Sequence, residues 1–256
     1  MAYRVTRREL FGAGGIAGVS LLGGSVLGSA VSCAASAHAA EFPWPYKKLD
    51  PAEVAERAYR DFRQGGCMFA GFNGIIGLLA DKFGEPYSGF PSAMMSYGAG
   101  GVANWGTVCG ALNGASAVVA LFASGSERTA IIDDLFRYYV QTELPSFAPK
   151  NPRNDVELVP AKAGSPLCHV SISNSGYKLG SKEHSERCGW LAAEISARAA
   201  ASLNARLEGT FESPLTIMPE TAYCLECHGR DGEGPTQVGK MNCVGCHEDH
   251  TKAGTK

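Results

Sequence analysis

The sequence has little net charge and no concentration of charge of one sign. Lysine and arginine number 23 against 25 aspartate and glutamate, so the formal net charge of the 256 residues is -2. A nucleic-acid-binding protein usually shows a basic stripe or basic residues interleaved with aromatic ones, and the sequence has neither. We therefore expect no nucleic-acid partner, and the charge balance gives no argument for an acidic one.

The sequence also lacks a strongly apolar run of the kind that spans a membrane, which takes about 20 residues. The stretch 12–30 is instead rich in glycine, alanine and serine, and it follows the paired arginines Arg7 and Arg8. Ala37-His38-Ala39 then supplies the small-x-small pattern of a cleavage site. These features predict a twin-arginine signal peptide over residues 1–39, export to the periplasm and no stable membrane span after cleavage. A membrane anchor is the alternative.

Two C-x-x-C-H pentapeptides stand close together, Cys224-Leu-Glu-Cys227-His228 and Cys243-Val-Gly-Cys246-His247. Each is the attachment signature of a c-type haem, in which two thiols form thioether bonds and the histidine ligates the iron. The spacing of the cysteine pairs also fits a zinc ribbon, but a ribbon has no use for a histidine after each pair. We predict two haem c groups per chain, with thioether bonds to Cys224, Cys227, Cys243 and Cys246 and with His228 and His247 as proximal iron ligands.

The sixth ligand of each haem iron must come from the remaining histidines or methionines. His250 is three residues from His247, and three residues span at most about 10 Å, so His250 is too close to reach the opposite face of the same haem. It could serve another haem, in the same chain or in a partner chain. His184 lies near an expected helix start, where its side chain could point toward the haem segment. We predict His184 and His250 as distal ligands, with His169 as the alternate.

Four of the nine cysteines lie outside both the haem motifs and the signal peptide, namely Cys67, Cys109, Cys168 and Cys188. Cys33 belongs to the signal peptide, where the alternative is a lipoprotein cysteine. Two disulfides are the ordinary state of four cysteines in an exported protein, whereas four thiolates suit a [2Fe-2S] or [4Fe-4S] cluster. Twin-arginine substrates are typically exported already folded, so a cofactor inserted before export would explain the signal. Both states stay open at this point.

Helical patterns dominate residues 40–208. Asp50 caps a helix that Gly65-Gly66 ends, and Cys67 opens a second helix that is apolar almost all round. Further helices are expected over 104–123, 126–140 and 182–207, with irregular segments over 85–103 and 145–181. The glycine and alanine content of the third helix suggests close packing against another helix or a cofactor.

The segment 209–256 differs from the rest because it is short of apolar residues and rich in glycine, cysteine and histidine. A segment of this size cannot build its own core, and covalently bound haem would hold it together. The expected fold is therefore mainly α, with a cysteine-containing domain of about five helices over 40–208 and a small, irregular dihaem segment over 209–256.

The cysteine pattern carries a family resemblance. Gly66-Cys67-Met68-Phe69-Ala70-Gly71-Phe72, followed by Cys109-Gly110 and by single cysteines at 168 and 188, resembles the C-GCAxxG-C-C family of redox proteins. With two haem motifs appended, the chain is similar to the exported dihaem members of that family. The resemblance implies a mostly helical N-terminal domain, a haem tail and a homodimer in which the haems cluster at one end. It also implies bis-histidine haems, one axial ligand crossing between subunits, and a cysteine site for iron and sulfur.

The function expected from these features is that of a periplasmic dihaem c-type cytochrome. It would transfer electrons between a cysteine-bound cluster and bis-histidine haems, with redox proteins as partners and no catalytic residues. Two alternatives remain. One is a multihaem reductase or peroxidase with one open haem site, and the other is a structural zinc-ribbon protein with disulfides.

Overall fold

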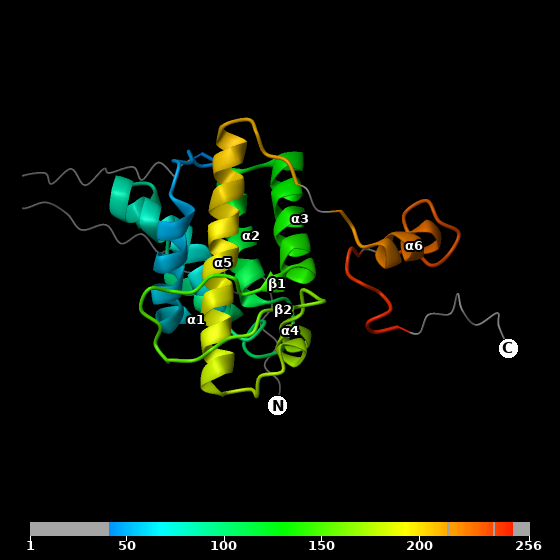
Figure 1. The fold of residues 1–256 in the computed structure, drawn as a ribbon. Coiled ribbons are helices and arrows are strands. Elements are labelled where there is room, and N and C mark those ends of the chain that lie inside the picture. Colours follow the sequence, from blue (N-terminus) through cyan, green and yellow to red (C-terminus); the bar gives the residue numbers. More distant parts are fainter. Residues whose placement is uncertain (1–40, 214–215, 238, 248–256) are drawn as a thin grey trace, which may run out of the picture. The chain divides into compact units, whose positions relative to one another are not determined.

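The computed structural model describes residues 41–247, apart from 214–215 and 238, and its fold is mainly α as predicted (Figure 1). The expected signal peptide and His250 lie outside the described residues. The described elements are the helices α1 (Pro51–Phe83), α2 (Gly110–Phe122), α3 (Gly125–Gln141), α4 (Cys168–Ser175), α5 (Lys182–Leu207) and α6 (Pro219–His228), the short 3-10 helices η1 (Tyr87–Gly89) and η2 (Ser92–Gly98), and the strands β1 (Glu143–Leu144) and β2 (Ala161–Lys162).

Helix α1 contains the two helices expected on either side of a glycine pair. Asp50 caps it by accepting a hydrogen bond from the Ala52 amide at 2.9 Å, and Pro51 takes the first helical position. Gly66 interrupts the helix with φ 76° and ψ -166°, a conformation that residues with a side chain rarely adopt. The kink separates the two halves, and Cys67 opens the second half, as predicted.

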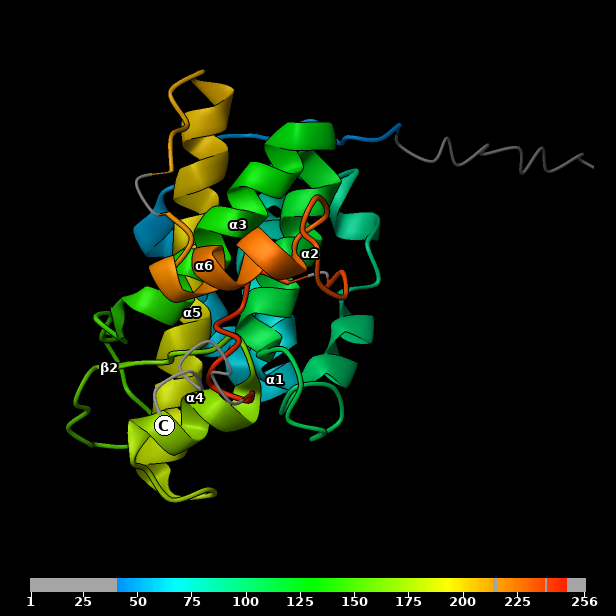
Figure 2. The same cartoon turned by 90° about the vertical axis from the view of Figure 1, so that its right-hand side faces the viewer.

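The helices α1, α2 and α5 pack against one another, and α3 covers α2 and α5 (Figures 1 and 2). Phe72, Leu112, Leu135 and Ile195, one from each helix, are all fully buried in the shared core. Small residues let α1 and α2 approach closely, since a Cβ atom on Gly114 would lie 2.1 Å from the Met68 carbonyl oxygen. The close packing expected for the glycine-rich third helix is confirmed.

One predicted helix start is wrong, because the helix expected from Asn104 begins at Gly110. Residues 100–104, which we call the left-handed segment, have φ angles of 63°, 68°, 58°, 47° and 65°. Glycine adopts such angles freely, whereas each other residue costs roughly 1–2 kcal/mol and cannot continue into a right-handed helix. The preceding stretch 85–103, expected to be irregular, also contains the two short 3-10 helices.

Buried carboxylates fix the loop between β1 and β2 against the helices. Glu194 of α5 accepts hydrogen bonds from the Ser146 amide at 2.7 Å and from the Tyr138 hydroxyl at 2.8 Å. Glu186 of α5 is 1% exposed and accepts from the Asn154 amide at 3.1 Å. Helix α5 keeps its predicted bounds, with Ser181 capping it. Within the described part of the chain, every helix is too short or too polar to cross a membrane.

Candidate cysteine and haem sites

Four cysteines from four different elements come together at one end of the helical domain. Cys67 follows the kink of α1, Cys109 caps α2, Cys168 begins α4, and Cys188 lies in the second turn of α5. Cys188 lies close enough to Cys67 to raise the pKa of the Cys67 thiol, and Cys67 in turn raises the pKa of the Cys109 and Cys168 thiols. We call these four residues the cysteine cluster.

The backbone comes close to the cysteine cluster because its local geometry is unusual. Val108 and Leu167 form an isolated antiparallel bridge, flanked by hydrogen bonds from the Cys109 amide to the Pro166 carbonyl at 2.8 Å and from the Cys168 amide to the Thr107 carbonyl at 2.7 Å. A Cβ atom on Gly101, in the left-handed segment, would lie 2.9 Å from the Cys168 Cβ atom. The strained backbone of this segment therefore allows close approach to the cysteines.

Burial sets the acid–base chemistry of these thiols. Removal from water raises the pKa of Cys109 to about 11 and that of Cys168 to about 12. The hydrogen bond with Cys188, together with burial, raises the pKa of Cys67 as well. None of the eight cysteines within the described residues forms a disulfide. Because iron and zinc bind thiolates, loading this site with metal must release protons.

The donor set and its surroundings suit a group larger than one metal ion. Among the described residues, no three histidine, cysteine or carboxylate side chains are arranged around the position of a single ion. A cluster with several irons shares four thiolates among its metals, so the four thiols need not converge on one point. One fully buried polar atom near the cysteines, Arg187 Nε, has no hydrogen-bond partner among the described residues. An orphaned donor of this kind suits an acceptor such as a sulfur-rich cluster.

His184 faces the cysteine cluster, an orientation different from the one expected toward the haem segment. Its Nδ1 accepts a hydrogen bond from the Gly180 amide at 3.3 Å, and its Nε2 lies 3.6 Å from the Cys188 sulfur. Residues four apart on a helix lie on the same face, so the spacing of His184 and Cys188 was a signal for this contact. Burial, and then the charge of Arg187, lower the pKa of His184.

His169 has the geometry of a metal-binding histidine. Its Nδ1 lies 2.8 Å from the Gly106 carbonyl oxygen, which requires the N–H to be on Nδ1 and leaves the lone pair on Nε2. Histidines that bind metals almost always orient themselves through such a bond from the other ring nitrogen. The side chain is exposed, so its Nε2 can reach a group outside the helical domain.

The first haem motif forms the last five residues of α6. His228 Nδ1 lies 3.1 Å from the Pro235 carbonyl oxygen, which favours the tautomer with the lone pair on Nε2, as an iron ligand requires. The loop after α6 folds back through hydrogen bonds from the Gly234 amide to the Cys227 carbonyl and from the Gln237 amide to the His228 carbonyl, both 2.8 Å. The proximal histidine is therefore oriented by its own loop.

The second haem motif forms a single turn. The amides of Cys246 and His247 both donate to the Cys243 carbonyl, at 3.1 Å and 3.0 Å. Thr221 of α6 links the two motifs, because its hydroxyl donates to the Met241 carbonyl at 3.1 Å. The second cysteine of each motif, Cys227 or Cys246, is exposed, so a haem edge can reach it.

Contacts from α3 hold the haem segment. The Gln141 side-chain amide donates to the Thr216 carbonyl at 2.9 Å, the Ser213 hydroxyl donates to Asp134 at 2.8 Å, and Lys240 pairs with Asp133. These bonds are few and mostly exposed. The attachment of the segment is therefore mostly polar, with Phe211 as an apolar contact against the helical core.

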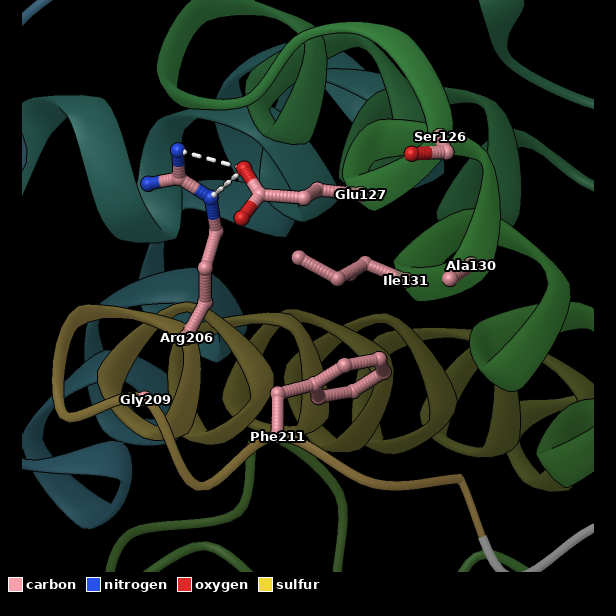
Figure 3. A pocket seen from close by; sticks show the side chains of 7 residues that line it. All are labelled: Ser126, Glu127, Ala130, Ile131, Arg206, Gly209 and Phe211. Atoms are coloured by element: carbon pink, nitrogen blue, oxygen red, sulfur yellow. Dashed lines mark hydrogen bonds and ion pairs between the residues drawn. The ribbon is translucent and has the colours of Figure 1, made fainter.

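A hollow of about 340 Å³ between the start of α3 and the end of α5 is separate from both sites (Figure 3). The ion pair between Glu127 and Arg206, at 2.8 Å, spans it, and Ile131 and Phe211 line its apolar side. Neither a cysteine nor a histidine lines the hollow. Its ion pair joins the two helices and gives no sign of redox chemistry.

The helical fold, the cysteine cluster and the haem motifs together define a redox protein of the cytochrome c class. The family described as "Putative redox-active protein (C_GCAxxG_C_C)" matches residues 69–202, a range that includes Cys109, Cys168 and Cys188 and begins two residues after Cys67. The chain belongs to this family. The resemblance seen in the cysteine pattern is thereby confirmed.

Two comparisons with split-Soret cytochrome c of Desulfovibrio desulfuricans narrow the class. That protein is 37% identical to this chain, with 95% of this chain and 94% of the relative covered. A solved structure of the split-Soret cytochrome c from this organism, described as showing a novel iron centre, aligns with a TM-score of 0.76 and 36% identity. The alignment covers 80% of this chain and 90% of that chain. The predicted redox function and an iron-containing haem cofactor are supported.

Proposed function

We propose that this chain is an exported dihaem c-type cytochrome that transfers single electrons between an iron-sulfur cluster and two bis-histidine haems. The observation that carries the proposal is the meeting of the buried Cys109 and Cys168 with the half-buried Cys67 and Cys188 in one group. Haem c and a [2Fe-2S] or [4Fe-4S] cluster would each supply a one-electron couple. The related solved structure is described as having a novel iron centre, which favours iron at these cysteines.

The helical domain holds the four thiols in place before any metal binds. Their backbone is fixed by the bridge between Val108 and Leu167 and by helix starts at Cys109 and Cys168. The Cys109 and Cys168 thiols are protonated at neutral pH, and burial raises their pKa further, so metal must displace protons from them. Such a site favours insertion during or after folding in the cytoplasm, followed by export along the twin-arginine route.

The histidines divide between the two sites. After removal of a signal peptide, five histidines remain, and His228 and His247 follow the haem cysteines. His184 is turned toward Cys188, whereas His169 is exposed and already oriented through Gly106. We infer that His169 is one distal haem ligand and that His250, as expected from its spacing, is the other. In a homodimer, one of these ligands would cross to the haem of the second subunit.

Iron, haem and acid-labile sulfide measured on one purified sample test the cofactor proposal. Two haems per chain, together with further iron and sulfide, are expected. Two iron atoms without sulfide would remove the cluster, and zinc without covalent haem would establish a structural ribbon instead.

The optical spectrum tests the ligand proposal. A low-spin spectrum that cyanide does not change quickly is expected for bis-histidine haems. His169→Ala or His250→Ala should open one haem to cyanide, whereas His184→Ala should leave both haems low-spin. A high-spin ferric haem in the unaltered protein would favour a reductase or peroxidase.

A further inference from the structure

Arg187 is a buried cation without a visible counter-charge. It is 1% exposed and is the largest fully buried side chain of the described residues. Its Nη2 donates to the Ser171 hydroxyl at 3.1 Å, and its Nε has no partner among the described residues. A buried ion that is not paired costs several kcal/mol, so such a cation requires an explanation.

The carboxylates of the described residues do not supply the missing charge. Each ion pair that an arginine forms within the described residues involves an arginine other than Arg187, and the neighbouring Glu186 is bound by Arg153. The Glu186 carboxylate also accepts hydrogen bonds from Trp190 at 3.0 Å and from the Asn154 side chain at 2.8 Å. The acid next to Arg187 in sequence is thus committed to other partners.

What Arg187 does face is the cysteine cluster. Arg187 directly precedes Cys188 on α5, and its guanidinium reaches Ser171 on α4, three residues after Cys168. The buried guanidinium therefore lies between two of the helices that carry the cysteines.

We propose that Arg187 is the fixed counter-charge of the cofactor bound by Cys67, Cys109, Cys168 and Cys188, and that it raises the reduction potential of that cofactor. The inference rests on the proposed function, since it requires the cluster. An iron-sulfur cluster on four thiolates has a net negative charge, and one-electron reduction makes that charge more negative. A nearby buried cation stabilises the reduced form more than the oxidised form, because the local dielectric constant is low.

The same reasoning predicts opposite effects of Arg187 on stability with and without the cluster. In the loaded protein the cation and the cluster compensate each other, so removing the cation leaves a buried negative charge. In a protein without the cluster the cation is the uncompensated group, and replacing it by an apolar side chain of similar length removes a cost. A residue that only filled space would change stability in the same direction in both states.

The test uses the full-length protein carrying Arg187→Met, with Arg187→Lys to keep the charge. EPR-monitored redox titration should show a lower potential for the cluster of Arg187→Met, by at least a tenfold change in the one-electron equilibrium, which is 59 mV. The reduction potential of Arg187→Lys should stay closer to that of the unaltered protein. Arg198→Met is the matched control on the same helix, because Arg198 is paired with Asp134 at 2.9 Å, and it should leave the potential unchanged.

Thermal unfolding completes the test. Arg187→Met should lower the midpoint in the loaded protein and raise or preserve it in a Cys67→Ala/Cys109→Ala background, which cannot hold the cluster. Arg198→Met should lower the midpoint in both backgrounds. A loaded Arg187→Met protein with an unchanged potential, or with equal destabilisation in both backgrounds, overturns this inference and leaves the proposed function standing. Absence of labile sulfide from the unaltered protein overturns both.

Discussion

The chain contains two cysteine-rich regions that are built in opposite ways. The cysteine cluster takes one residue from each of α1, α2, α4 and α5, spread over more than a hundred positions of sequence. The haem segment places its cysteines in two local pentapeptides, and Thr221 is the one buried residue among those described from 209 to 247. The first site depends on a packed core, and the second depends on short motifs.

This difference teaches which part of the fold needs its cofactor. A core of four helices can position the buried thiols by itself, because apolar burial drives its folding. The haem segment has too little apolar surface to do so, and thioether bonds to haem would supply the missing constraint. We therefore expect the helical domain to fold first and the haem segment to become ordered only when haem is attached.

Removing a thioether bond should give the largest effect. It tests whether the haem segment depends on covalent haem while the helical domain does not. Cys227→Ser or Cys246→Ser should abolish normal covalent attachment at that motif, since two thiols are needed for the two bonds. Mass spectrometry should show loss of one haem, and limited proteolysis should cut the segment after 209. The midpoint of unfolding of the helical domain should stay unchanged. A parallel loss of helical circular dichroism would show that the two regions fold as one.

A change at the contact of α1 and α2 should have the next largest effect. In Gly114→Val the new side chain would meet the Met68 carbonyl, which lies 2.1 Å from an ideal Cβ and cannot move aside without shifting the helix. We expect a loss of about 3 kcal/mol or more in the free energy of unfolding, measured by urea denaturation. Gly245→Ala in the second haem motif is the control, because its nearest atom is 3.7 Å away, and it should cost almost nothing.

The pH dependence of the free energy of unfolding, measured on the cluster-free protein, tests the burial of the thiols in the cysteine cluster. Burial raises the pKa of Cys109 from 9.0 to about 11 and that of Cys168 to about 12, so the folded state holds these protons longer than the unfolded state. The contribution of these two thiols to the free energy of unfolding is fully present below pH 9. It falls as the pH rises toward 11, by about 1.4 kcal/mol per pH unit for each thiol. Urea denaturation of chelator-treated protein from pH 7 to 10.5 measures this slope.

The Cys109→Ala/Cys168→Ala protein serves as the control for that slope. Without these two thiols the stability should vary much less over the same pH range. An equally steep loss in the double variant would assign the slope to other groups, such as Cys67 or Tyr139, whose pKa values are also raised.

Local features of the fold could be predicted from the sequence, whereas long-range ones could not. Helix α5 keeps its predicted bounds because Ser181 caps it and the apolar spacing runs unbroken. The haem motifs are recognisable because their residues are adjacent. The predicted start of α2 was wrong because Val102, Ala103 and Asn104 adopt positive φ, which the side chains of Val102 and Ala103 disfavour. Tertiary contacts around the cysteines impose that conformation.

The cysteine cluster also shows that long-range contacts could not be predicted from the sequence. The four cysteines were identified, but their meeting depends on how α1, α2, α4 and α5 pack, which their spacing does not encode. The buried Arg187 was missed because an arginine in a helix with charged neighbours usually lies on the surface. His184 was expected to face the haem segment, although its i, i+4 relation to Cys188 pointed to the contact found.

The smallest predicted effect concerns the attachment between the two regions. Lys240 of the haem segment pairs with Asp133 of α3, and the lysine side chain is 56% exposed. Exposed ion pairs contribute about 0–1 kcal/mol, so Lys240→Ala should leave the unfolding midpoint of the helical domain within error. It should instead raise the rate of proteolysis of the haem segment in low salt, and 1 M salt should remove the difference because screening weakens the pair in the unaltered protein. Lys82→Ala, which removes an exposed ion pair with Glu53 within α1, is the control and should not affect the segment. A large drop in midpoint with Lys240→Ala would mean that the haem segment forms part of the folding unit of α3.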